Sequence, residues 1–290
     1  MPVPRFAWFV MVHHKPAEFE WLINALAATA DPIFVHVDAK SRLGLKRDRR
    51  GIMRHVRRII SPHASIRLMR SRFTNWGGWS LSQVLLDAIK LALRTDPAWT
   101  HFINLSGQCY PLQPIETIKR QVAEAGDRVH VEMLPIADLP IDDWHRGAPA
   151  MIETPLRAFK TGGAAPPLGF TVEHKGSQWI IVPRSFCEWL VAAPLTDAVV
   201  RYLKRRLLSD ELVMQTLAAN GPFRDRIAPH YGRAITWPGP KVLTMADLPN
   251  LTASSDWFGR KFDTGIDAEV LHELAARNIF IPGPVAATLA

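Results

Sequence analysis

The chain has 290 residues, of which 48% are hydrophobic and 21% are charged, a composition typical of a globular protein. Its two cysteines, Cys109 and Cys187, argue against a disulfide framework and a cysteine-based zinc site, and no run approaches the roughly 18 apolar residues of a membrane-spanning helix. The 35 Lys and Arg exceed the 27 Asp and Glu by eight, and the surplus is local, because residues 40–72 carry a net charge of +11 and the rest of the chain −3.

In the first half of the chain, apolar runs alternate with the spacing of one helical face. The predicted strands cover residues 5–12, 32–37, 65–69, 100–105 and 128–133. The predicted helices cover residues 19–27, 81–92 and 115–125, and Ser80 is the expected N-cap of the second. This alternation implies βαβ units and a mainly parallel sheet.

The first apolar run stops at His13-His14-Lys15, which favours a buried strand over a signal peptide. In open parallel sheets, ligands bind beyond the carboxyl ends of the strands. The residues at these ends are therefore the first candidates for a binding site. They are Val12, His13, Asp38, Ser106 and Gly107.

Residues 135–177 contain six prolines and a glycine pair, which predicts a long functional loop without regular structure. Regular patterns then resume. We expect a strand over 178–182, helices beginning at Pro183, over 197–208 and at Ser209, a strand over 234–237 and a helix over 267–277. Because the alternation continues, we predict one domain covering residues 1–290.

Several common enzyme motifs are absent from the sequence. It has no Gly-x-Gly-x-x-Gly fingerprint, no phosphate-binding P-loop and no Gly-x-Ser-x-Gly elbow, so dinucleotide, P-loop and serine-hydrolase functions lack support. It also has no Asp-x-Asp pair, the usual carboxylate arrangement that holds a divalent cation against a diphosphate. If the protein binds a diphosphate, side-chain cations have to meet its charge.

Three polar or aromatic segments each allow two interpretations. Asn75-Trp-Gly-Gly-Trp79 fits stacking on a base or sugar, or a tight turn whose tryptophans fill the core. Phe102–Gln108 ends a buried strand in polar residues, which suits a ligand site or an ordinary turn. In Ser209-Asp210-Glu211, the carboxylates complement a helix N-terminus, or one of them acts as a general base.

Seven short motifs follow one another along residues 6–265. They are His13-His14-Lys15, His36-Val37-Asp38, Trp76-Gly77-Gly78-x-Ser80, Asn104-Leu105-Ser106-Gly107-Gln108-x-Tyr110-Pro111-Leu112, Lys175-Gly176-Ser177-Gln178-Trp179, Ser209-Asp210-Glu211 and Gly259-Arg260-Lys261-Phe262-Asp263. This series resembles the core-2/I-branching glycosyltransferase family, which includes β-1,6-N-acetylglucosaminyltransferases and peptide O-xylosyltransferases.

The resemblance implies a GT-A-type α/β fold with a nucleotide-binding half, about 1–130, and an acceptor-binding and catalytic half, about 131–290. It implies inverting transfer of a sugar from a UDP-sugar to a hydroxyl, without a metal or other cofactor, to form a β-glycosidic bond. N-acetylglucosamine is the expected sugar. UDP-xylose is the alternative donor, because Trp-Gly-Gly-x-Ser is closer to the xylosyltransferase branch.

The resemblance also implies roles for individual residues. These are Glu211 as catalytic base, Arg233 and Lys261 as diphosphate contacts, and Val12, Asp38 and Trp76 as nucleotide-binding residues. A carboxylate suits the first role because an acceptor hydroxyl, with a pKa far above 7, must lose its proton as it attacks. We also expect Glu132, near the start of the long loop, to contact the acceptor. Cys109 stands where the family usually has Asp, so we expect a local structural change at this position of the donor site.

The basic segment 40–72 allows four interpretations. It is a solvated surface, it attracts an anionic UDP-sugar, it rests on an anionic membrane that carries a lipid-linked acceptor, or the protein binds nucleic acid. The solvated surface is favoured over a binding role, and nucleic acid is not expected, because aromatic residues do not alternate with the basic ones. We expect a bacterial-type member in the cytoplasm, peripheral at the inner face of the membrane, that acts on a glycan, glycolipid or lipid-linked acceptor in polysaccharide synthesis.

Overall fold

The computed structural model describes residues 4–45, 50–139, 149–162, 167, 169–237 and 239–278. Its central sheet has the strand order β10-β4-β1-β2-β3. These strands are β1 (Phe6–Val12), β2 (Ile33–Val37), β3 (Ile66–Leu68), β4 (His101–Ser106) and β10 (Ile181–Pro183). All neighbouring pairs are parallel except β10 with β4. The predicted α/β fold with a mainly parallel sheet is confirmed.

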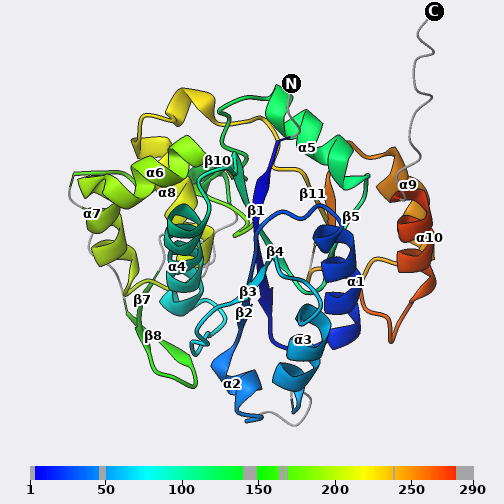
Figure 1. Ribbon diagram of the computed structural model, residues 1–290. Helices are drawn as coiled ribbons and strands as arrows, with labels where there is room; N and C mark the ends of the chain where they lie inside the picture. The colour runs from blue at the N-terminus through cyan, green and yellow to red at the C-terminus, as the bar shows by residue number, and fades with distance from the viewer. Residues whose placement is uncertain are drawn as a thin grey trace, which may run out of the picture.

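Helices cover both faces of this sheet (Figure 1). Alternate side chains of β1 enter two cores, because successive residues of a strand point to opposite faces. One core packs against α4 (Trp79–Thr95), α6 (Arg184–Ala192), α7 (Pro194–Leu203) and α8 (Val213–Asn220). The other packs against α1 (Pro16–Ala27), α3 (Ile52–Ile60) and α5 (Ile115–Glu124). The short α2 (Ala39–Arg42) follows β2 directly.

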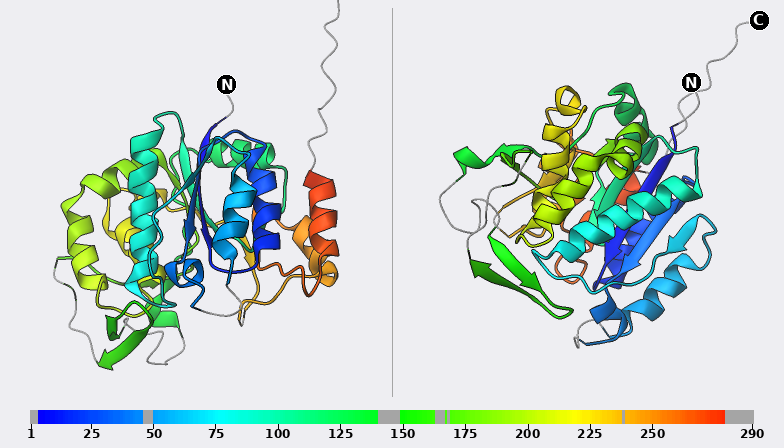
Figure 2. Two further views of the ribbon diagram at one scale, coloured as in Figure 1. Left: turned by 60° about the horizontal axis from the view of Figure 1, so that its bottom comes forward. Right: turned by 90° about the vertical axis from the view of Figure 1, so that its left-hand side faces the viewer.

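A smaller sheet joins distant segments in the order β11-β12-β5. Its strands are β5 (Cys109–Pro111), β11 (Arg233–Ile235) and β12 (Phe258–Arg260). α9 (Leu248–Ala253) and α10 (Glu269–Asn278) pack a third core against β5. The pairing of β12 with β5 is antiparallel and holds Arg260 opposite Cys109, just beyond the end of β4. The turned views in Figure 2 show these late segments beside the central sheet.

The predicted long loop contains more regular structure than its proline content indicated. β7 (Ala150–Glu153) and β8 (Ala158–Gly162) form an antiparallel hairpin. β6 (Leu134–Pro135) pairs with β9 (His174–Lys175). Short 3-10 turns lie at Ile136–Asp138, Ser209–Glu211, Arg224–Arg226 and Met245–Asp247.

Three local predictions were wrong. Residues 128–133 form no strand, because Val129 and His130 make only isolated bridges to Ile227 and Ile181. Ser80 does not cap α4, whose N-cap is Gly78, and Ser209 begins a 3-10 turn instead of a helix. Both serine hydroxyls make tertiary contacts, Ser80 with Glu153 and Ser209 with Ser82.

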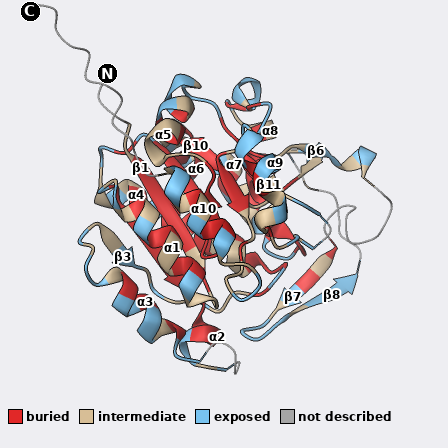
Figure 3. Ribbon diagram, turned by 90° about the vertical axis from the view of Figure 1, so that its right-hand side faces the viewer, coloured by how far each residue is buried: buried red, intermediate tan, exposed pale blue. Residues whose placement is uncertain are grey.

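β10 brings the second half of the chain into the sheet of the first half. We therefore propose that the nucleotide-binding half, about 1–130, and the acceptor-binding half, about 131–290, form one domain with a shared sheet. Residues 279–290 of this proposed domain lie outside the described residues. None of the helices among the described residues is both long and apolar enough to cross a bilayer. Buried residues in Figure 3 follow the central strands and the inner faces of the helices.

Candidate active site

The carboxyl ends of β1, β2 and β4 border a cavity of about 330 Å³, here called the sheet-edge cavity. Its lining is mostly polar or aromatic. The residues are Met11, His13, Asp38, Lys40, Thr74, Asn75, Trp76, Leu81, Ser106, Gln178, Trp179 and Arg260. This is the edge at which parallel sheets bind ligands, and three of the five strand-end candidates, His13, Asp38 and Ser106, line the cavity.

Asp38 holds the loop that leads to Trp76. One carboxylate oxygen accepts hydrogen bonds from the Thr74 backbone N–H and hydroxyl, both at 3.0 Å. The other accepts from the Ser41 hydroxyl at 3.3 Å. Val12, at the end of β1, contacts Asp38 through its backbone, because its carbonyl accepts a hydrogen bond from the Asp38 N–H at 3.2 Å. Its side chain is buried in the core. Of these two predicted nucleotide-binding residues, only Asp38 lines the sheet-edge cavity.

Arg260 lines the sheet-edge cavity, and the sequence pattern alone assigned it no role. Its guanidinium lies 4.6 Å from the Trp179 ring centroid and donates a hydrogen bond to the Ser106 hydroxyl. Among the described residues it makes no ion pair with a carboxylate. A planar cation at the cavity edge without a carboxylate partner is suited to bind a diphosphate.

The signal for Arg260 was present in the sequence, since it stands beside Lys261. Lys261 lies just after β12 and lines neither of the two cavities described here. Its predicted diphosphate contact stays a prediction.

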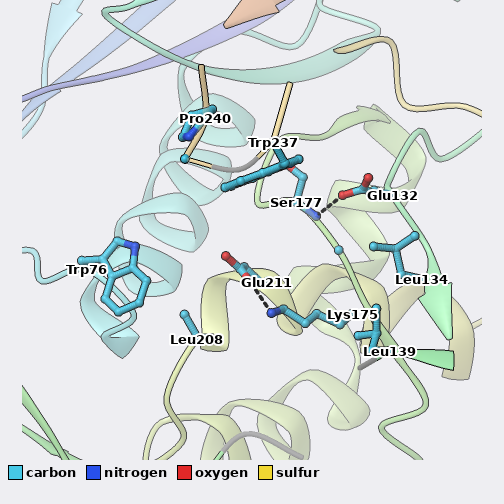
Figure 4. Close-up of a pocket in the computed structure, with 12 residues that line it drawn as sticks. Trp76, Glu132, Leu134, Leu139, Lys175, Ser177, Leu208, Glu211, Trp237 and Pro240 are labelled. Carbon is cyan, nitrogen blue, oxygen red and sulfur yellow. Dashed lines mark hydrogen bonds and ion pairs between the residues drawn. The ribbon is translucent and has the colours of Figure 1, made fainter. Parts of the chain in front are cut away.

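A second cavity of about 560 Å³, here called the large cavity, adjoins the first. Trp76 lines both, and its side chain is exposed. The large cavity is lined by Trp76, Glu132, Leu134, Leu139, Lys175, Gly176, Ser177, Leu208, Glu211, Trp237, Gly239 and Pro240 (Figure 4). Charged groups on its wall are thus surrounded by leucines and two tryptophans, a combination that suits a polar ligand with apolar faces.

Glu211 presents its carboxylate to the large cavity. It ends the 3-10 turn Ser209–Glu211 that precedes α8, and its carboxylate lies 2.9 Å from the Lys175 ammonium (Figure 4). Its backbone carbonyl accepts a hydrogen bond from the Gly176 N–H at 3.0 Å. The chain must pass very close here, since a Cβ on Gly176 would come within 2.1 Å of the Glu132 carbonyl oxygen.

The neighbouring carboxylate, Asp210, has the opposite environment. It is buried, and burial followed by repulsion from Glu211 raises its pKa to about 7. One of its oxygens, Oδ1, has no hydrogen-bond partner among the described residues. The sequence motif did not distinguish the two carboxylates, whereas the turn directs only Glu211 into the large cavity.

Glu132 lies on the same wall as Glu211. Its carboxylate accepts a hydrogen bond from the Ser177 N–H at 2.7 Å, and burial raises its pKa. The segment 175–177 therefore holds Glu132 and Glu211 at one cavity, although the two are far apart in sequence. Glu132, the expected acceptor contact, therefore lines the same cavity as Glu211, the predicted base.

Arg233 has a different environment from the one expected of a diphosphate contact. Its guanidinium is buried and donates to the backbone carbonyls of Tyr231, Gly232, Asn104 and Ile180 at 3.3–3.4 Å. Burial lowers its pKa to about 10. It lines neither of the two cavities, so in this structure it joins β11 to the central sheet.

The part of the chain that the structure describes contains no cluster of three His, Cys, Asp or Glu side chains arranged to hold a metal ion. His13 and His14 stack with ring centroids 4.0 Å apart. Only His13 of the two lines the sheet-edge cavity.

The sequence matches the family model described as "Branch: Core-2/I-Branching enzyme" over residues 6–253. A xylosyltransferase of Ciona intestinalis is 24% identical, and the match covers 93% of this chain and 34% of that protein. Xylosyltransferase 2 of Rattus norvegicus is also 24% identical, over 94% of this chain and 33% of that protein. The chain therefore spans about a third of the length of these relatives.

Among solved structures, mouse xyloside xylosyltransferase 1 in its apo form is 10% identical with a TM-score of 0.42. The match covers 88% of this chain and 97% of that one.

Proposed function

Because the chain belongs to the core-2/I-branching enzyme family, we propose that it is an inverting glycosyltransferase that moves a sugar from a UDP-sugar to a hydroxyl of a glycan acceptor. One observation carries the proposal. The Glu211 carboxylate, in the large cavity, and the Arg260 guanidinium, in the sheet-edge cavity, belong to adjoining cavities that share Trp76. A base and a cation for a departing diphosphate are the two groups that such a transfer needs.

The UDP moiety of the donor is assigned to the sheet-edge cavity. Asp38 lines this cavity and is held by the Val12 backbone carbonyl, and Trp76 offers an aromatic face beside it. The diphosphate extends toward Arg260, and Lys261 is kept as a second cation that reaches it. The sugar then lies near Trp76, where the two cavities meet.

The acceptor is assigned to the large cavity. Glu211 removes the proton of the attacking hydroxyl as its oxygen bonds to the anomeric carbon. The bond from that carbon to the diphosphate breaks, and its electron pair leaves with UDP. Arg260 stabilises the negative charge that develops there. Attack from the face opposite the leaving group turns an α-linked donor into a β-glycoside.

Two sugars are candidates. N-acetylglucosamine is our first proposal, from the resemblance to the branching enzymes. Xylose is the second, and it is favoured by the names of the relatives in Ciona and rat. The match to an enzyme family favours transfer over the alternative of nucleic-acid binding.

A thermal-shift panel with UDP, UDP-N-acetylglucosamine, UDP-xylose, UDP-glucose and UDP-galactose tests the donor. A ligand that binds only the folded state raises the free energy of unfolding, by about 2.7 kcal/mol when it is present at 100 times its Kd, and so raises Tm. We expect a rise with UDP and a larger rise with one UDP-sugar. If none of the five ligands raises Tm, the donor proposal is wrong.

Transfer should persist in excess EDTA. The charge on the departing UDP is met by Arg260, with Lys261 as the second proposed cation, so a chelator removes nothing that the reaction needs. The measurement is the initial rate with and without EDTA, using the donor that the thermal-shift panel selects. A rate that disappears with EDTA and returns with Mn²⁺ would contradict this prediction.

A further inference from the structure

Large apolar side chains are exposed on two protrusions of the molecule. One is the segment after α2, with Leu43 and Leu45, and the other is the β7–β8 hairpin, with Ile152, Leu156 and Phe159. These five side chains are between 40% and 64% exposed. Figures 1 and 3 both show α2 and the hairpin at the lower edge of the molecule. A soluble surface normally avoids such a concentration of apolar groups on one side.

The hairpin has one apolar outer face. Ile152 and Phe159 are directly opposite in the strand register, so their side chains lie on the same face. Leu156 lies in the turn, which is closed by a hydrogen bond from the Thr154 N–H to the Arg157 carbonyl at 2.9 Å. The exposed apolar groups therefore run from the strands to the tip.

The other face of the hairpin is anchored to the protein. Glu153 accepts hydrogen bonds from the Ser80 N–H at 3.0 Å and from the Asn75 amide at 2.9 Å. The same Asn75 amide donates to the Thr154 carbonyl at 2.9 Å. A Cβ on Gly78 would come within 2.3 Å of the Glu153 carboxylate, so this contact is tightly packed. The exposed apolar face is thus held in place by a polar clamp.

Basic side chains accompany both protrusions. The Arg157 guanidinium lies 4.5 Å from the Phe159 ring centroid, at the hairpin itself. Near the other protrusion, the basic segment 40–72 exposes several arginines on α3 and the chain around it. They are Arg42, Arg50, Arg54, Arg57, Arg58, Arg67, Arg70 and Arg72. Lys46, Arg47 and Arg49 of this segment lie outside the described residues.

We propose that this edge docks on a bilayer that contains anionic phospholipid. Leu43, Leu45 and the three apolar side chains of the hairpin enter the headgroup region, and the exposed arginines in the described part of residues 40–72 contact the lipid phosphates. Stable peripheral attachment needs two signals, apolar insertion and electrostatic attraction, and both are present here. Apolar side chains on two separate protrusions, each accompanied by arginines, suit a deformable bilayer better than the flat, complementary face of a partner protein.

Docking in this way would bring the proposed active site to the bilayer. The hairpin clamp involves Asn75, which immediately precedes Trp76, the residue shared by the two cavities. An acceptor anchored in the membrane by a lipid would then meet the large cavity from the bilayer side. Attachment itself does not depend on the proposed transfer reaction, so vesicle binding tests it without donor or acceptor.

The test is flotation of the purified protein with vesicles of phosphatidylcholine alone or with about 30% phosphatidylglycerol. We expect binding only to the anionic vesicles, and release when salt rises from about 0.1 M to about 0.5 M. Leu156→Ser should weaken binding about tenfold. Val191→Ser, which removes an exposed apolar side chain from α6, is the matched control and should leave binding unchanged.

A labelled variant keeps the proposal testable if vesicle affinity is weak. Both native cysteines are buried, so an environment-sensitive dye on Leu156→Cys reports on the hairpin tip alone. Its emission should shift to the blue with anionic vesicles. Absence of wild-type binding to anionic vesicles, or equal binding by the Leu156 and Val191 variants, would overturn the proposal. Self-association that depends on Leu156 without vesicle binding would instead assign this face to a second copy of the chain.

Discussion

Replacing Glu211 by Gln is expected to lower kcat about 100- to 10,000-fold while the affinity for UDP is retained. The substitution keeps the size of the side chain but removes the carboxylate that takes the proton of the acceptor hydroxyl. Because Glu211 lines the large cavity and not the sheet-edge cavity, nucleotide binding should be little affected. The measurements are single-turnover transfer rates and UDP titration by calorimetry.

The control for this experiment is Glu188→Gln. Glu188 is an exposed glutamate that pairs with Arg184 at 2.7 Å, so its replacement also breaks an ion pair, as that of Glu211 does with Lys175. It lines neither cavity and should retain the wild-type rate. Full activity in Glu211→Gln would exclude Glu211 as the base.

Replacing Arg260 by Met should lower kcat/KM about 100- to 1,000-fold, the usual cost of removing one group that stabilises developing negative charge. Methionine preserves much of the packing on Trp179, so the loss should come from the missing charge and hydrogen bonds. UDP affinity should also fall. Arg260→Lys should recover only part of the rate, because an ammonium lacks the planar, bidentate geometry of the guanidinium.

Arg94→Met is the matched control, since Arg94 is exposed near the end of α4 and lines neither cavity. A comparison with Arg233→Met then separates the two arginines. Arg233 is buried among four backbone carbonyls, so its loss should lower Tm. If Arg233→Met folds with unchanged Tm but loses UDP affinity, and Arg260→Met retains it, the predicted diphosphate role belongs to Arg233.

The sequence predicted the edge of the sheet that borders the sheet-edge cavity, because its signals there are local. Apolar runs predicted β1, β2 and β4, and the polar residues after them necessarily meet at one edge of a parallel sheet. Asp38 follows from this reasoning on the residue pattern alone. The prediction of a strand over 128–133 was wrong because it also rested on a local signal. An apolar run does not show whether a neighbouring strand is available for pairing.

The order of motifs along the chain determined the family, the fold class and the candidate base, since each depends on residue type and spacing. Only the tertiary structure decided which charged group of each adjacent pair faces a cavity. Burial separates Asp210 from Glu211, and the β12–β5 pairing presents Arg260 at the sheet-edge cavity. It also decided that the proline-rich loop contains a clamped hairpin with an apolar outer face, because Asn75, Ser80 and Glu153 come from segments far apart in sequence. Orientation and desolvation arise from such contacts between distant segments, and the spacing within one short motif does not encode them.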